Sequence, residues 1–196
     1  MIQILASSFV LAALLAGGPP QAMKEDLVSH LEGYLSSIRN HEMEGALAHL
    51  APDFQLRFEG SPDHISRQGM RDILGWDMAV GSQVEKLSCR LEGERTLRCR
   101  LREANRVLDL LGVEELFSDN RLEFDGQGRI RRHVSRVEEH EPSWQDQMAK
   151  AVEWLSEHHP KGLEKVRPGG KAEFSTATAQ GWLTLLRRWR EATGGS

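Results

Sequence analysis

A histidine and a serine two residues apart are the side chains of this sequence best placed to do chemistry. His133 and Ser135 fall within Arg129 to Val137, a stretch whose composition predicts a strand. Because alternate side chains of a strand share a face, His133, Ser135 and Val137 point the same way. If that face lines a pocket, His133 would bind a ligand or transfer a proton near neutral pH. The alternative is a hydrogen-bonded structural histidine.

The only tyrosine of the chain is the second candidate. Leu27, Leu31, Tyr34 and Ile38 recur at the spacing of one helical face, which predicts a helix over Met23 to Ile38 with Tyr34 on its inner side. The hydroxyl of Tyr34 would then either face a pocket or bond a backbone carbonyl.

Three further residues are candidates for the mouth or the wall of a pocket. Glu103 and Asn105 follow a predicted strand at the point where its alternation breaks, and polar residues there either border a pocket or cap a loop. Trp76 ends a helix that we expect to start at the turn around Asp63. It forms either a pocket wall or the end of a helix packed on the sheet.

Several other chemistries lack support in the sequence. None of the eight histidines is paired at ligand spacing with a carboxylate on one element, so we predict no metal site. The chain has no Gly-x-Ser-x-Gly elbow and no phosphate-binding glycine loop, and we expect no cofactor. A net charge of -4 gives no global positive field for nucleic acid.

The predicted elements place these candidates on a sheet with helices. Alternation of Phe54, Leu56 and Phe58 predicts a strand buried on one face. Two hairpins follow, turning near Glu92-Gly93-Glu94 and at Asp125-Gly126-Gln127-Gly128. They comprise Val84–Leu91 with Thr96–Leu101, and Val113–Phe124 with Arg129–Val137. Between the hairpins, residues 103–111 predict a short helix or a wide loop.

The end of the chain predicts two more helices. The first carries Trp144 and the second carries Trp182 and Trp189 on an apolar stripe, with a Gly-, Pro- and Lys-containing connector over residues 161–173. The stripe must be covered by the main domain or by a partner, for example a second copy of the chain.

The N-terminus predicts export. Ile2 to Ala16 is mostly apolar and too short to span a bilayer, and it fits a signal peptide over residues 1–22 with Ala22 as a cleavage point. No stable membrane span would remain, and the protein would be secreted or periplasmic. Cys89 and Cys99 flank the first hairpin turn. A loop of three or five residues would place them opposite each other, and a two-residue loop would not, so a disulfide and two buried thiols both stay open.

Taken together, the elements resemble the nuclear transport factor 2-like superfamily, which includes ketosteroid isomerases, SnoaL-like polyketide cyclases and limonene epoxide hydrolases. The resemblance covers about residues 26–139 and rests on the element order, on the helices ending near Asp53-Phe54 and on the closing stretch FDGQGRI. It implies a cone-shaped antiparallel sheet with a pocket behind the first helix. The fold hosts enzymes, binding modules and interaction domains.

The same resemblance argues against the known reactions. The tyrosine of the isomerases looks like Tyr34, but counting from it puts their catalytic base at Phe58, which cannot abstract a proton. Their second oxyanion donor falls at Asp119 or Asn120. In the polyketide cyclases the last strand carries a His and an Asp two residues later, and the corresponding residues here look like His133 and Ser135. The Asp-Arg-Asp set of the epoxide hydrolases cannot be assembled.

We therefore expect an α+β fold, in which a curved antiparallel sheet with helices on its concave side occupies residues 23–140 and two helices occupy residues 141–196. The favoured function is the binding of a small apolar ligand or a protein partner. The alternative is acid/base catalysis on a hydrophobic carbonyl compound by His133 with Tyr34 and Asn120 or Asp119. The expected ligand contacts are Tyr34, Phe54, Phe58, Trp76, Glu103, Asn120, His133 and Ser135.

Overall fold

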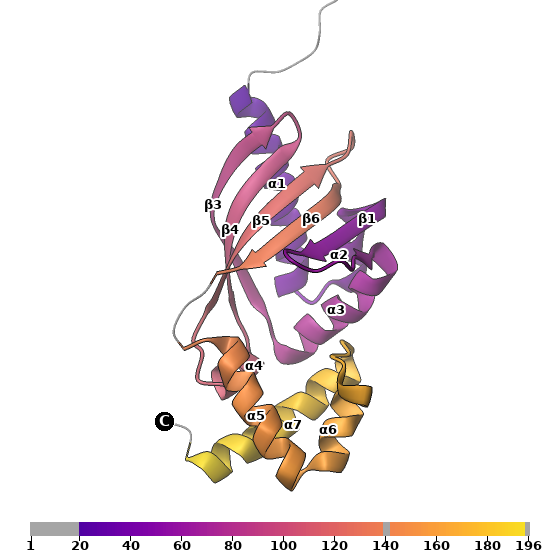
Figure 1. Ribbon diagram of the computed structural model, residues 1–196. Coiled ribbons are helices and arrows are strands. Elements are labelled where there is room, and N and C mark those ends of the chain that lie inside the picture. The colour runs from indigo at the N-terminus through magenta and orange to yellow at the C-terminus, as the bar shows by residue number, and fades with distance from the viewer. Residues whose placement is uncertain (1–19, 139–141, 195–196) are drawn as a thin grey trace, which may run out of the picture.

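The computed structural model describes residues 20–138 and 142–194, with a curved sheet above a group of C-terminal helices (Figure 1). The signal segment expected over residues 1–22 therefore lies almost wholly outside the described residues, and Ala22 falls in the first turn of α1. The helices are α1 (Pro20–Arg39), α2 (Met43–Ala48), α3 (Arg67–Val80), α4 (Arg106–Leu110), α5 (Trp144–His158), α6 (Pro160–Val166) and α7 (Thr176–Thr193). The strands are β1 (Leu50–Phe58), β2 (Ile65–Ser66), β3 (Gln83–Gly93), β4 (Thr96–Ala104), β5 (Leu116–Phe124) and β6 (Ile130–Val137).

The strands form one mixed sheet in the order β2-β1-β6-β5-β4-β3. Four neighbouring pairs are antiparallel, as expected, but β1 and β6 are parallel. The expectation of a wholly antiparallel sheet was wrong at this pair because the sequence pattern shows hairpins and does not show which distant strands meet. The connection between β1 and β6 contains most of the fold, and a parallel pair requires such a long connection.

Helix α1 covers the concave face of the sheet and fills it with apolar side chains. Leu31 and Leu35 of α1 are 1% and 2% exposed and pack with Leu97 and Leu122 of the sheet in one hydrophobic cluster. The register sets Leu97 opposite Leu122, and Leu122 opposite His133, so these residues share one row across the sheet. The inside of the cone is therefore largely a packed core.

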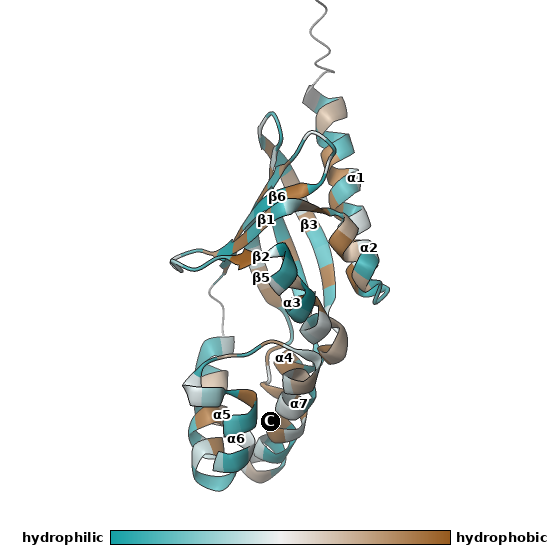
Figure 2. Cartoon of the chain, turned by 90° about the vertical axis from the view of Figure 1, so that its right-hand side faces the viewer, coloured by the Kyte–Doolittle hydropathy of each residue, from teal (hydrophilic) through white to brown (hydrophobic). Residues whose placement is uncertain are grey.

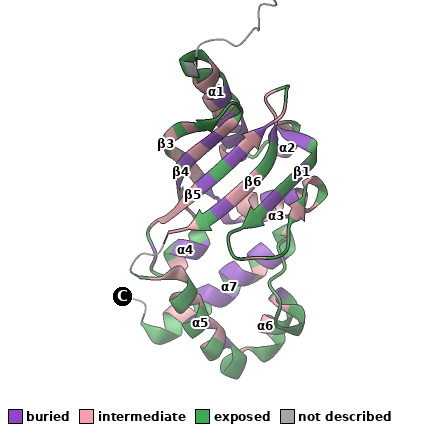
Figure 3. Cartoon of the chain, turned by 45° about the horizontal axis from the view of Figure 1, so that its top comes forward, coloured by how far each residue is buried: buried purple, intermediate pink, exposed green. Residues whose placement is uncertain are grey.

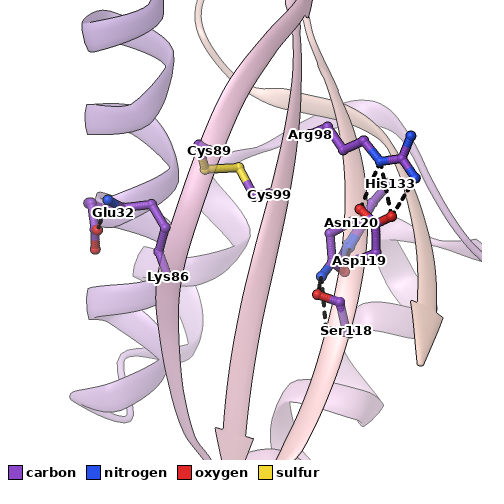
Figure 4. The surroundings of a disulfide bond; sticks show 9 residues. All are labelled: Glu32, Lys86, Cys89, Arg98, Cys99, Ser118, Asp119, Asn120 and His133. Carbon is purple, nitrogen blue, oxygen red and sulfur yellow. Dashed lines mark hydrogen bonds and ion pairs between the residues drawn. A yellow bond between two sulfur atoms is a disulfide. The ribbon is translucent and has the colours of Figure 1, made fainter. Parts of the chain in front are cut away.

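A disulfide joins β3 and β4 in the middle of this face (Figure 4). The turn has only two residues, since Gly93 pairs with Thr96, and a bulge between Leu91 and Gly93 then shifts the register by one. This bulge puts Cys89 directly opposite Cys99, with their Cα atoms 4.1 Å apart. Loop length alone could not decide between disulfide and free thiols because the extra residue lies inside the strand.

Residues 142–194 contain three α-helices where two were expected. Residues 161–173 form most of α6 and a short 3-10 turn (Pro168–Gly170) where a connector was predicted. Pro160 begins α6 at a position where proline loses no helical hydrogen bond. Helix α7 is held at its start by a capping box between Ser175 and Thr178.

A second hydrophobic cluster unites these helices with the lower end of the sheet. Leu155 and Leu186 are fully buried, and Trp182 is 5% exposed. Figure 2 shows the hydrophobic residues of α5 and α7 in brown, and Figure 3 shows α7 as the most buried helix of the group. The tryptophan stripe of α7 therefore packs within the chain, against α3, α4 and α5. No helix among the described residues combines the length and the apolarity needed to cross a membrane.

Candidate functional site

His133 lies on the concave face and forms a hydrogen-bonded chain with β5. Its Nε2 lies 2.8 Å from Asn120 Oδ1, and Asn120 Nδ2 donates to Ser118 O and Ser118 Oγ (Figure 4). Because Ser118 O can only accept, the amide orientation of Asn120 is fixed, and His133 Nε2–H must be the donor. Burial lowers the pKa of His133 to about 4. The ring is thus neutral at pH 7, with one nitrogen already bonded inside the protein.

Ser135, Phe54 and Phe58 lie in different surroundings. Ser135 is buried opposite Asn120, and Phe54 is 2% exposed in the core. Phe58 was expected to point into the cone, but it is 44% exposed. It ends β1, beyond the part of the strand that the core covers, so alternation no longer determines burial there. Phe58 is therefore not a buried aromatic floor of the cone.

Asp119 was one of two candidates for an oxyanion donor, and its side chain lies on the outer face of the sheet. Arg98 Nε donates to its carboxylate at 2.9 Å, and Arg136 Nη2 at 3.3 Å. These hydrogen bonds and positive charges hold the pKa of Asp119 below its usual range. An ionised, paired carboxylate outside the cone cannot donate a hydrogen bond within it, so only Asn120 of the two candidates faces the interior.

Tyr34 points into the core from α1, as its helical spacing predicted. It is 6% exposed, and none of the described residues forms a hydrogen bond with its hydroxyl. Burial and the nearby carboxyl group of Asp77 on α3 raise the pKa of Tyr34. The phenol is therefore protonated at any ordinary pH and could only donate or accept a hydrogen bond.

A cavity of about 640 Å³ lies where the end of the cone meets the C-terminal helices. Apolar and aromatic side chains form most of its walls, with Trp76 from α3, Leu116 from β5, and Trp144 and Trp182 from α5 and α7. The complete lining is Trp76, Glu103, Asn105, Val107, Leu108, Leu116, Trp144, Gln145, Met148, Ala149, Val152, Glu153, Arg167, Ala172, Glu173, Phe174 and Trp182. Of the ligand contacts expected from sequence, the structure brings Trp76 and Glu103 together here.

A small network fixes Glu103 at this cavity. Gly81 caps the C-terminus of α3, and its left-handed conformation (φ 73°) turns the chain so that Ser82 is buried. Ser82 Oγ and Asn105 Nδ2 each donate to Glu103 Oε1 at 2.8 Å. Asn105 also caps α4, since its Oδ1 accepts from Val107 N and Leu108 N at 2.9 Å. Asn105 thus has both of the roles considered for it.

Asp77 is a residue of this region that the sequence did not single out. Burial, and then the charge of Glu103, raise the pKa of Asp77 well above its usual value. Two carboxyl groups with different environments therefore lie close together near the cavity. Asp77 directly follows Trp76 on α3, but nothing in the local sequence shows that β4 brings Glu103 beside it.

The aromatic residues of the extension were also missed as site residues. Trp144 and Trp182 were recognised as helix-stripe residues, and the signal that could have placed them at a site is the need to cover that stripe. The indole Nε1–H of Trp144 is fully buried and has no hydrogen-bond partner in the described part of the chain. Among the described residues, no group of three His, Cys, Asp or Glu side chains could hold a metal ion.

Comparisons with known proteins bear on the fold. No protein-family model matches the sequence, and no curated protein matches it significantly. The structure is similar to that of PrhC from Penicillium brasilianum, with a TM-score of 0.53 and 13% identity over 73% of this chain and 97% of that one. It is also similar to AusH from Aspergillus nidulans, with a TM-score of 0.50 and 11% identity over 59% of this chain and 85% of that one.

A third similar structure is that of SalBIII, described as an epoxide hydrolase/cyclase-like enzyme of pyran ring formation, with a TM-score of 0.50 and 11% identity over 60% of this chain and 92% of that one. Identities this low establish a shared architecture and leave activity open. The curved sheet, the helix across its concave face and these similarities together show that the chain has the nuclear transport factor 2-like fold.

Proposed function

We propose that this protein binds a small apolar molecule, and that the ligand occupies the cavity between the cone and the C-terminal helices. The observation that carries this proposal is the cavity itself, whose volume of about 640 Å³ falls in the range of ligand pockets. Its walls are mainly apolar and aromatic, with a few polar groups at fixed positions, which is the composition expected of such a pocket. The interior of the cone, by contrast, is occupied by the packed core.

The binding test uses a neutral fluorescent probe, N-phenyl-1-naphthylamine, together with the intrinsic fluorescence of the protein. Three of the five tryptophans line the cavity, so a bound probe should quench tryptophan emission and gain fluorescence itself. Ala149→Trp would fill the cavity from α5 and should weaken binding at least tenfold. Lys150→Trp, an exposed neighbour outside the cavity, is the matched control. Absence of probe binding by the natural protein, or equal binding by both variants, would reject the proposal.

A second candidate function is acid/base catalysis on a hydrophobic carbonyl compound. The observation that favours it is Asp77, because a carboxyl group whose pKa is raised by burial and by a neighbouring carboxylate can serve as a general acid or base. It no longer depends on His133, whose ring is neutral and bonded to Asn120. Exchange of α-hydrogens of hydrophobic ketones in D2O, followed by NMR, is the test. Exchange that is lost in Asp77→Asn supports it, and exchange no faster than in buffer rejects it.

We also propose that the protein is exported. The apolar stretch Ile2 to Ala16 and the disulfide Cys89–Cys99 support this, since such disulfides persist mainly in oxidising compartments. Fusing residues 1–22 to a reporter enzyme that is active only outside the cytosol would test it. An inactive reporter, with a known signal peptide as positive control, would contradict export.

A further inference from the structure

The charged groups that line the cavity are mainly acidic. They comprise the carboxylates of Glu103, Glu153 and Glu173 and the guanidinium of Arg167. Within the described part of the chain, none of the three carboxylates forms a salt bridge. Arg167 Nη2 donates to Gly170 O at 2.6 Å, which holds this cation at the 3-10 turn. The lining therefore carries more negative than positive charge, and none of its carboxylates is paired with Arg167.

Glu103 is the carboxylate that a bound molecule would meet at a fixed position. Both of its hydrogen bonds, from Ser82 and Asn105, reach Oε1, and Oε2 accepts none from the described residues. Asn105 is itself held by its cap on α4. Glu153 and Glu173, by contrast, are exposed at the rim, where water screens their charges. A single oriented acceptor, in a cavity whose lining is otherwise mainly apolar, is thus left for a donor from outside the protein.

The aromatic walls favour the same kind of donor. Trp76 and Phe174 meet edge to face with their ring centroids 5.4 Å apart, and Trp144 and Trp182 complete the aromatic lining. The faces of such rings attract cations, more weakly at an exposed ring such as Phe174 (43% exposed) than at a buried ring such as Trp182 (5% exposed). An anionic ligand would instead bring its charge towards that of Glu103, and the cation of the lining, Arg167, is held at the 3-10 turn by its bond to Gly170 O.

We infer that the cavity selects apolar molecules that carry a protonated amine, with the ammonium group bonded to Glu103 Oε2 and its carbon skeleton against the tryptophans. This inference rests on the proposed function and specifies the ligand class for the same cavity. We expect an amine with at least one N–H to bind more tightly than a neutral alcohol of the same shape. The ammonium group would donate a charge-assisted hydrogen bond to Glu103 Oε2, which is stronger than the hydrogen bond from a neutral hydroxyl group.

Calorimetry at pH 7 with three ligands of matched shape tests this inference: 2-naphthylmethylamine, 2-naphthylmethanol and 2-naphthoic acid. We expect the amine to bind at least tenfold more tightly than the alcohol, and the acid most weakly. Glu103→Gln keeps an acceptor oxygen for Ser82 and Asn105 and should reduce amine affinity to that of the alcohol. Glu157→Gln, an equal charge change on α5 outside the cavity, should leave the preference intact.

The outcomes distinguish failure of the amine preference from failure of the proposed binding of apolar molecules. If the natural protein binds the alcohol as tightly as the amine, or if Glu103→Gln keeps the preference, the inference is wrong while apolar binding stands. If N-phenyl-1-naphthylamine binds but none of the three ligands does, the inference is also wrong. If no neutral probe binds at all, the proposed function itself fails. The comparison of ligands needs only the natural protein, so it remains decisive even if the variant does not fold.

Discussion

Acidification should destabilise this protein through His133, and the structure gives the size of the effect. Burial lowers the folded-state pKa of His133 to about 4, from 6.5 in the unfolded chain. The unfolded chain therefore binds the proton more tightly, and the stability held above pH 6.5 is lost as the pH falls through this interval. Linkage gives a loss of about 2 kcal/mol between pH 7 and pH 5, and about 3 kcal/mol by pH 4.

The perturbation that isolates this effect is His133→Gln. Glutamine cannot titrate, and its side-chain amide can still donate to Asn120 Oδ1 in place of His133 Nε2. His49 and Asp77 also make the unfolding free energy depend on pH. Burial lowers the pKa of His49, whereas burial and the charge of Glu103 raise that of Asp77. Both contributions are present in the two proteins and cancel in the difference between them.

The assay is urea unfolding at pH 7 and at pH 5, monitored by tryptophan fluorescence, with linear extrapolation to water. The natural protein should lose about 2 kcal/mol more than His133→Gln over this range. Any constant cost of the substitution drops out, because only the change with pH is compared. Equal losses in the two proteins would refute the reasoning, and would mean that His133 is protonated in the folded state or accessible to water.

Four further substitutions test other parts of the structure by the same unfolding measurement. Cys89→Ser should cost about 2–3 kcal/mol by releasing the hairpin, and a reducing agent should have a matching effect on the natural protein only. Phe54→Ala should cost about 3–5 kcal/mol and Phe58→Ala less than about 1 kcal/mol, and comparable costs would contradict the exposure of Phe58. Asp77→Asn should stabilise the protein at pH 7 but not at pH 3. Because the pKa of Asp77 is raised in the folded state, its contribution to the unfolding free energy falls as the pH rises above the pKa that Asp77 has in the unfolded chain. A variant less stable than the natural protein at pH 7 would contradict this.

The strands and hairpins could be predicted because each is encoded locally. Alternation and the turn residues at Asp125-Gly126 are enough to define β5 and β6, and helical spacing is enough to place Tyr34 inward. Alternation also separates Asp119 from Asn120, but only the register decides which of them faces the cone. Alternation fails to predict burial at Phe58, because β1 extends beyond the core at this end and leaves the side chain exposed.

The cavity could be predicted only in part because it is a product of tertiary packing. Trp76 and Glu103 were identified from their places at the end of a helix and of a strand. Asp77, Trp144 and Trp182 join them only because the C-terminal helices pack against the open end of the cone. No local pattern contains that arrangement, and the sequence favoured packing of the α7 stripe within the chain without excluding a partner.

The placement of the cavity has a consequence for the motions of the molecule. Its walls come both from the cone, through α3, β4 and β5, and from the helices α5 and α7. A molecule held there loses its contacts when either part opens, so occupancy would raise the free energy of both opening reactions. Two separate local unfolding events would then become one cooperative event. Amide hydrogen exchange in α5 and at the end of β4 would slow together as the cavity fills, and would report occupancy even for a ligand without an optical signal.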